Sequence, residues 1–378
     1  MAKTFIAPVS LLVGTTIGAG IFSLPYVFSK SGLWLGLIYL LILSLASFVI
    51  HLLYADIVVR TYDGHHRFPG YAKIYLGKYG EIFANFVIFT TLLLMLTVYL
   101  ILSVSFTSLI FPQIPEYFKI FVFWILGSTA ILFGIKKEAL FESLTTFITL
   151  AIILVIFIFG FFGDFSKINF SSFINLKFAL LPLGPVLFSL IGQTAIPPIV
   201  VYFKNEELEI SQIKKIIFWG TILPAIFYFL FILGIFGLSG NISQDAVSGL
   251  INHVNPIFLI LLGIFGFISL WDSYASIGTD IKKILNYDWS LSKITASLVA
   301  IFVPLILYLL GLKNFLGLIG FVGGIMLSLW ALLIIIIWKK SSCTDCQQKI
   351  LGTINPVIIY TVTFILIGAL IYQIKTFF

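Results

Sequence analysis

The sequence predicts an all-α polytopic membrane protein, and three observations support that prediction. Of its 378 residues, 60% are apolar and only 10% are charged, which is too little charge to cover a soluble protein of this size. The apolar residues form long runs, and a helical span needs about 20 of them. These runs lack the polar–apolar alternation of a membrane β-barrel. A soluble enzyme, a disordered chain and a disulfide-rich secreted domain are therefore excluded.

Apolar runs that end at charged or turn residues predict about eleven transmembrane helices in a single transporter-sized domain, residues 1–378. The predicted helices are 6–29, 33–60, 80–110, 117–134, 139–163, 178–203, 212–238, 256–285, 291–310, 314–338 and 353–374. The first run continues through Phe28, which favours a retained helix over a cleaved signal peptide.

The positive charges predict how the chain is oriented. With a cytoplasmic N-terminus, sixteen Lys and Arg residues lie inside and six outside, which together make up all 22. This distribution follows the positive-inside rule, and eleven helices then put the C-terminus outside. We expect a multi-pass protein of the cell (inner) membrane. The net charge of +7 is spread over short loops, so the expected surroundings are a lipid bilayer and not a nucleic acid.

The predicted helices divide into two halves of similar length. Residues 6–163 contain five helices, residues 178–338 contain another five, and 353–374 is one extra C-terminal helix. Because five is an odd number, the second half must be inverted relative to the first. The sequence thus predicts a 5+5 inverted repeat, an arrangement found in many secondary transporters.

The first helix of each half is interrupted by glycine and proline. The interrupting residues are Gly14, Gly18, Gly20 and Pro25 in the first helix, and Gly184, Pro185, Gly192, Pro197 and Pro198 in the sixth. Glycine weakens a helix, and proline removes a backbone donor. Broken backbone is tolerated in a bilayer only where it lines a buried cavity. Paired breaks in the two halves therefore predict a binding site near the membrane midplane.

Segment 13–25 reads VGTTIGAGIFSLP, and it resembles the first helix of the amino acid–polyamine–organocation superfamily. It looks most like the aromatic and hydroxy amino acid permease branch. Supporting similarities are Tyr54-Ala55-Asp56, Pro69-Gly70-Tyr71 and Phe188-Ser189-Leu190, so the resemblance covers roughly the first two thirds of the chain. It implies a LeuT-like fold with helices 1 and 6 broken, and transport of an amino acid.

The broken first helix offers groups for both ends of an amino acid. Free N–H groups after the break suit the carboxylate, and carbonyl groups before it suit the ammonium group or a cation. The sixth helix is expected to close the site from the other side. The candidate substrate-binding residues are Thr16, Ile17, Gly18, Ala19, Gly20, Phe188, Ser189 and Gly192. The alternative is that such glycines only permit close helix packing, which is the interpretation favoured for Gly320 and Gly324.

Asp272 lies about 24 Å along the predicted helix 256–285, near the middle of the membrane. A carboxylate at this depth is costly unless it is paired, protonated or bound to a cation, so it predicts a functional role. It shares one helix face with Ser269, Ser273, Ser276 and Asp280, of which Asp280 lies beside two lysines and is predicted to be a solvated or ion-paired end.

The resemblance implies a role for this carboxylate. In sodium-coupled LeuT-like proteins, hydroxyl residues of this helix bind the ion opposite the broken first helix. Carried over, the ion-coupling residues are Gly14, Ile17, Asp272 and Ser273. An aspartate departs from the usual serine or threonine, and it leaves open whether the cation is Na⁺ or H⁺.

Other polar residues have competing interpretations. His51 is deep in the second helix, where it is either a proton relay or a hydrogen-bonded structural residue. Asp56 and Arg60 are four residues apart and predict an ion pair, which could also hold a gate. Tyr99 either lines the site or packs. His65-His66 is a loop pair without a third ligand, and Cys343-Cys346 is a lone C-x-x-C without a second ligand pair, so no metal site is expected.

The sequence therefore predicts a secondary active amino acid permease that works by alternating access. The expected reaction is H⁺- or Na⁺-coupled symport of an aromatic or other small neutral amino acid, with no cofactor and no obligate protein partner. One alternative is an amino acid sensor without net flux, which the sequence does not separate from a transporter. The other is a membrane-embedded enzyme, for which no G-x-S-x-G, H-E-x-x-H or D-x-x-D motif is present.

Overall fold

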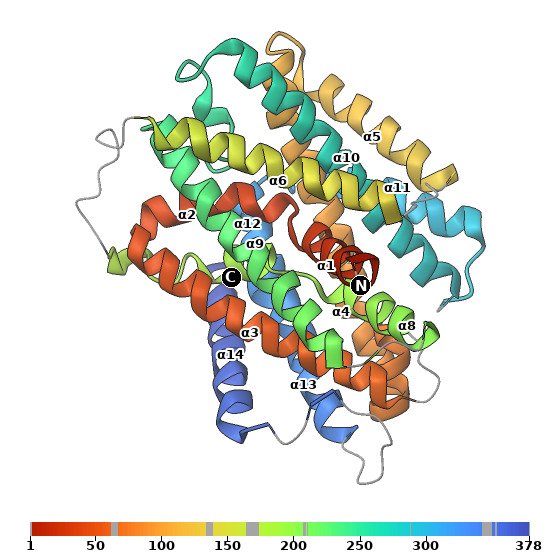
Figure 1. The fold of residues 1–378 in the computed structure, drawn as a ribbon. Helices are drawn as coiled ribbons and strands as arrows, with labels where there is room; N and C mark the ends of the chain where they lie inside the picture. Colours follow the sequence, from red (N-terminus) through yellow and green to blue (C-terminus); the bar gives the residue numbers. More distant parts are fainter. Residues whose placement is uncertain are drawn as a thin grey trace.

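The computed structural model describes residues 2–377 except 62–66, 134–138, 164–173, 207–208, 210, 288, 342–349 and 352–353. His65, His66, Cys343 and Cys346 lie outside the described residues. Within the described part, every regular element is helical (Figure 1). In chain order these are α1 (Ala2–Thr16), η1 (Ala19–Ser23), α2 (Leu24–Ser31), α3 (Leu33–Arg60), α4 (Phe68–Ile110), α5 (Glu116–Phe133), α6 (Ala139–Phe161), η3 (Leu176–Phe178), α7 (Leu183–Ser189), η4 (Gln193–Ala195), α8 (Ile196–Asn205), α9 (Ser211–Leu238), η5 (Ser248–Leu250), α10 (Pro256–Tyr287), α11 (Lys293–Leu309), α12 (Phe315–Phe321), η6 (Val322–Leu327), α13 (Ser328–Lys340) and α14 (Pro356–Phe377).

Each predicted helix overlaps a described helix or a pair of helices that a break separates. In the described residues, nine helices are long and apolar enough to cross a membrane, and a tenth span results if the bent pair Phe5–Thr16 and Ala19–Ser31 is one crossing. The helix Lys293–Leu309 is shorter than the others. The all-helical membrane fold is confirmed, whereas the count of eleven and the division into two five-helix repeats stay predictions.

The third span begins close to its predicted start at residue 80, but a short helix that the sequence did not predict precedes it. Helix α4 begins at Phe68 and bends at Gly77, whose φ of 74° and ψ of −168° are not helical. A positive φ is accessible to glycine at little cost, so Gly77 joins a short helix to the span that follows. Lys73 lies on this short helix, and Lys78 directly follows Gly77.

Both interrupted helices leave helical geometry where glycine occurs. In the first, α1 ends at Thr16, and Gly18 is extended with φ −130° and ψ −150° before η1 begins at Ala19. The two halves of this helix are bent by 45°. In the other, α7 ends at Ser189, and η4 begins at Gln193 after a short non-helical stretch. Figure 1 shows α1 and α4 in the middle of the bundle, with α5, α10 and α11 on one side and α13 and α14 on the other.

Glycines let helices α6 and α9 approach each other closely. A Cβ atom added to Gly160 or Gly163 would overlap the backbone of Gly234 or Gly237. Small residues at such crossings bring backbones into contact, which is how helices associate in a bilayer where the lipid is as apolar as the protein. Helix α9 contacts both α6 and the broken α1, and these two helices also contact each other.

A second glycine contact joins α7 to the segment α12–η6. A Cβ atom added to Gly184 would lie 2.7 Å from the carbonyl oxygen of Gly320, and Gly324 lies against Gln373 of α14. The packing role predicted for Gly320 and Gly324 is therefore confirmed. η6, which runs from Val322 to Leu327, is a π-helix, a rare form that occurs mostly as a short insertion within an α-helix.

Candidate functional site

The two helix breaks touch each other directly. A Cβ atom added to Gly20 would lie 2.6 Å from both the Cα and the Oγ of Ser189, and 3.0 Å from the ring of Phe188. A Cβ atom added to Gly192 would lie 2.8 Å from the Oγ1 of Thr16. The structure therefore brings the predicted substrate residues of the first and sixth helices together, and there glycine is needed for close approach.

A tyrosine of α9 joins the two breaks. The hydroxyl oxygen of Tyr228 lies 2.8 Å from the carbonyl oxygen of Thr16 and 2.5 Å from that of Ser189. Thr16 is the last residue of α1, and Ser189 is the last residue of α7. Carbonyl groups at a helix end lack intrahelical partners, so a buried one needs another donor. Sequence reasoning missed Tyr228, because nothing in the apolar run of α9 marks it as different from a packing residue.

The hydroxyl groups at the breaks are engaged within their own helices. Thr16 donates from Oγ1 to the carbonyl oxygen of Leu12 at 2.7 Å, and Ser189 donates from Oγ to that of Pro185 at 2.7 Å. The backbone N–H of Gly192 donates to the Oε1 of Gln193 at 3.0 Å. The protons of these two hydroxyl groups and the N–H of Gly192 are therefore already used within the protein.

A cavity of about 590 Å³ opens beside the first break. All four predicted ion-coupling residues line it: Gly14 and Ile17 from α1, and Asp272 and Ser273 from α10. The cavity continues along α10 to Asp280 and Lys283, which are 44% and 50% exposed and form an ion pair of 3.9 Å. The prediction that Asp280 is a solvated or ion-paired end is confirmed.

A smaller pocket of about 40 Å³ lies deeper, against Ile17 and Gly18. The residues that it shares with the larger cavity are Ile17, Thr149, Ile152, Phe265, Ser269 and Ser273. Its walls are mostly apolar, with phenylalanine side chains from four helical segments: Phe22, Phe106, Phe231 and Phe265. The ring of Phe22 packs edge-on against those of Phe106 and Phe231, at centroid distances of 4.9 and 5.6 Å.

The remaining predicted substrate residues line neither of these two cavities. Thr16, Ala19, Gly20, Phe188, Ser189 and Gly192 are buried where the two breaks meet. In this conformation a ligand in the larger cavity therefore reaches the first break through Gly14 and Ile17, and the second break through Ile191, Thr194 and Ala195.

Helix α6 contributes three hydroxyl side chains to the larger cavity, which sequence reasoning did not single out. They are Thr145, Thr146 and Thr149. A Cβ atom added to Gly14 would overlap the hydroxyl of Thr146, so this side chain lies directly against the first helix. Threonines on one face of an otherwise apolar helix were the available signal, since an i, i+4 spacing puts Thr145 and Thr149 side by side.

Tyr99 of α4 lines the site, which resolves the alternative left by the sequence. Its hydroxyl oxygen would lie 2.7 Å from a Cβ atom added to Gly18. The same hydroxyl interacts with the side chain of Ser273 and with the backbone of Ala19. Tyr99 therefore connects the broken first helix to α10 beside Asp272.

His51 lies behind the second break. Its Nδ1 is 3.0 Å from the Oγ1 of Thr221, and its side chain is fully buried. A Cβ atom added to Gly192 would lie 3.1 Å from the Cε1 of His51. Its Nε2 has no hydrogen-bond partner among the described residues. His51 lines neither cavity, so the hydrogen bond to Thr221 favours the structural interpretation over the relay.

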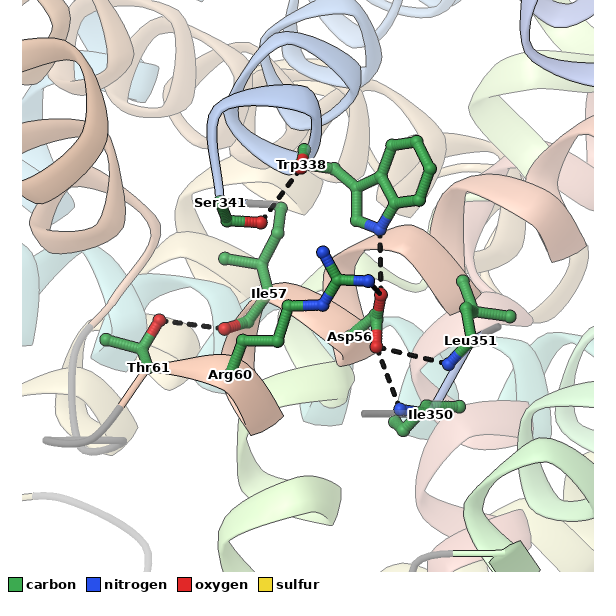
Figure 2. Close-up of polar contacts among 8 residues, drawn as sticks. All are labelled: Asp56, Ile57, Arg60, Thr61, Trp338, Ser341, Ile350 and Leu351. Carbon is green, nitrogen blue, oxygen red and sulfur yellow. Dashed lines mark hydrogen bonds and ion pairs between the residues drawn. The ribbon is translucent and has the colours of Figure 1, made fainter. Parts of the chain in front are cut away.

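Asp56 forms a separate cluster at the end of α3 (Figure 2). The predicted ion pair with Arg60 is confirmed at 2.5 Å. The buried carboxylate also accepts hydrogen bonds from the Trp338 indole and from the backbone N–H groups of Ile350 and Leu351, at 2.8, 2.8 and 3.2 Å. The guanidinium group of Arg60 lies 5.6 Å from the ring centroid of Trp338. These contacts join α3 to α13 and to the segment before α14.

Comparisons with known proteins agree with this architecture. A model described as the tryptophan/tyrosine permease family matches residues 1–373. Glutamine transporter 2 of Aliivibrio fischeri is 22% identical over 363 residues, which covers 90% of each chain. The crystal structure of MhsT in complex with L-phenylalanine, a LeuT-fold protein, matches with a TM-score of 0.70 at 16% identity, covering 99% of this chain and 98% of that one. The structural likeness shows the LeuT fold.

Proposed function

Because the chain belongs to the tryptophan/tyrosine permease family, and is thus a multi-pass membrane protein of an amino acid transporter family, we propose that it is a secondary active symporter. It couples entry of a neutral amino acid, preferentially an aromatic one, to Na⁺ or H⁺ by alternating access. The expected site is the inner membrane, with a cytoplasmic N-terminus. The observation that carries the proposal is the cavity that unites the first helix break with Asp272.

Backbone groups of the breaks supply the amino acid recognition in this proposal. The N–H groups of Gly18 and Gly20 at the start of the second half-helix favour the carboxylate. The carbonyl groups that end α1 and α7 favour the ammonium group. Direct contact between the two breaks supports a shared site, because it brings both sets of groups close together.

The small apolar pocket supports a preference for an aromatic side chain. Its phenylalanine rings, with Ile153, Ile156 and Leu262, offer edge and face contacts but few hydrogen-bond partners. An amide side chain such as that of glutamine would find only the hydroxyl groups of Thr149, Ser269 and Ser273 there, and each donor left unpaired would cost about 1–3 kcal/mol. The pocket adjoins the larger cavity, and a rotation of Phe22 or Phe265 would enlarge it for an indole or phenol ring.

The cation in this proposal lies between α1 and α10. Gly14, Ile17, Asp272 and Ser273 line one cavity. Their carbonyl, carboxylate and hydroxyl oxygens are the kind of ligand that suits Na⁺. The same carboxylate, shielded in a helix at mid-membrane, can instead carry a proton. The cavity leads from this point to Lys283, which supports access from one side of the membrane at a time.

An uptake screen in proteoliposomes tests the proposal. L-Tryptophan, L-tyrosine, L-phenylalanine, L-serine and L-glutamine are each offered under an inward Na⁺ gradient, an inward proton gradient, or neither. Concentrative uptake of an aromatic amino acid under one gradient is the expected result. Concentration of L-glutamine alone would contradict the aromatic preference. Binding without accumulation under either gradient would contradict symport and identify a sensor.

A further inference from the structure

The hydroxyl group of Tyr228 contacts the backbone at both helix breaks. Its side chain is fully buried, and its hydroxyl meets the carbonyl oxygens of residues 212 and 39 positions away in the chain, Thr16 and Ser189. A tyrosine hydroxyl carries one proton, so it donates to one carbonyl at a time or shares the proton between them. The two oxygens are thereby held close together although both carry partial negative charge.

Each of these two carbonyl oxygens can accept a further hydrogen bond besides the one from Tyr228. Each carbonyl oxygen has two lone pairs, and Tyr228 uses only one on each. Gly20 lies against Ser189, and Gly192 lies against Thr16, so the breaks are packed at two points and bridged by the tyrosine at a third. An ammonium group has three N–H donors and needs acceptors at a fixed spacing.

Tyr228 also lies next to the pocket proposed for the substrate side chain. Phe231 is three residues later on α9, on the same helix face, and it lines that pocket. One face of α9 therefore presents a hydroxyl to the breaks and a ring to the pocket, which are the places for the polar and apolar parts of one amino acid.

We propose that Tyr228 is a positioning residue for substrate recognition, whose hydroxyl holds the carbonyl oxygens of Thr16 and Ser189 at the spacing that binds the α-ammonium group. The inference rests on the proposed function, because it assigns an amino acid to this site. Removal of the hydroxyl leaves two buried carbonyl oxygens without their donor, so they separate or turn away, and the ammonium group loses preorganised acceptors.

Two replacements of Tyr228 distinguish the contribution of its hydrogen-bond donor from that of its ring. Tyr228→Phe keeps the shape and removes the donor, whereas 4-aminophenylalanine keeps the shape and restores N–H donors. We expect Tyr228→Phe to weaken L-tryptophan binding by about tenfold or more, and 4-aminophenylalanine to restore much of it. Tyr274→Phe is the matched control, because the hydroxyl of this buried residue has no hydrogen-bond partner among the described residues.

The readout compares L-tryptophan with indole-3-propionate, which lacks the ammonium group, by competition in detergent-solubilised protein. L-Glutamine and 4-carbamoylbutanoate replace this pair if the wild type binds glutamine instead. The positioning role predicts that Tyr228→Phe weakens the amino acid and leaves the des-amino compound unchanged. Equal weakening of both compounds, or wild-type binding of both, would overturn it. A wild type that binds no amino acid would instead refute the proposed function, so the two failures are distinguishable.

Discussion

The carboxylate of Asp56 accepts a 2.8 Å hydrogen bond from the indole nitrogen of Trp338, a residue 282 positions later in the chain. The same carboxylate receives two backbone N–H groups and the Arg60 guanidinium, and its side chain is fully buried. Four donors around one buried carboxylate satisfy its charge, and they fix the end of α3 against the segments on either side of residues 342–349.

Replacement of Asp56 by asparagine is predicted to destabilise the protein. The asparagine side chain is neutral, so Arg60 keeps a buried charge without its counter-ion. The asparagine NH₂ group also faces N–H donors that formerly bound the carboxylate. We expect a loss of roughly 2–4 kcal/mol, visible as a lower melting temperature in detergent. Glu81→Gln is the control, because its 3.3 Å ion pair with Lys73 is exposed on the lysine side. Equal melting temperatures for the two variants would contradict a stabilising cluster.

Gly20→Ala is predicted to disrupt the contact between the two breaks. The added methyl group would lie 2.6 Å from the Cα of Ser189, and a backbone atom cannot yield as a flexible side chain does. We expect amino acid affinity to fall by about tenfold or more, since overpacking costs about 1–3 kcal/mol. Gly368→Ala on α14 has open space around the new methyl group and serves as the control. Unchanged affinity in Gly20→Ala would show that the breaks can separate without cost.

Asp272→Asn is predicted to impair gradient-driven accumulation far more than exchange of substrate across the membrane. Asparagine keeps the shape of the side chain, but it is a weaker cation ligand and does not exchange a proton. Counterflow and gradient-driven uptake in the same proteoliposomes measure the difference. Asp280→Asn, on the same helix at the exposed end of the cavity, should behave like the wild type. Full accumulation by Asp272→Asn under both gradients would move the coupling site elsewhere.

His51→Asn is predicted to preserve coupling. The asparagine side chain can replace the Nδ1 contact with Thr221, which lies 3.0 Å from the imidazole. A structural histidine is then substituted with a modest loss of stability, about 1 kcal/mol, and with the driving ion unchanged. Thr221→Val, which removes the same bond from the other side, should give a similar loss. Loss of proton-driven uptake with intact exchange in His51→Asn would support the relay instead.

The orientation can be measured by labelling single cysteines in a background without Cys343 and Cys346. The charge distribution predicts that Gln244→Cys, in the loop after α9, reacts with a membrane-impermeant maleimide added to intact cells. Glu209→Cys, in the loop before α9, should react only after permeabilisation. Both side chains are exposed. The opposite pattern would reverse the predicted topology.

The sequence by itself determined the features that depend on near neighbours. Apolar runs specified the membrane spans because span length is fixed by bilayer thickness. Gly18 and Gly192 marked the two breaks, since glycine acts on its own backbone. The i, i+4 spacing of Asp56 and Arg60 predicted their ion pair, and helix rise placed Asp272 near the middle of its span.

Only the tertiary structure decided which helix faces meet. In a bilayer the lipid is as apolar as the protein interior, so hydrophobic periodicity does not mark the inward face as it does in water. Tyr228 lies in an apolar run that gives no sign of its two carbonyl partners. Trp338 reaches Asp56, and the α6 threonines reach Gly14, through contacts between residues far apart in the chain. These contacts depend on how the helices cross, and close packing through small residues determines those crossings.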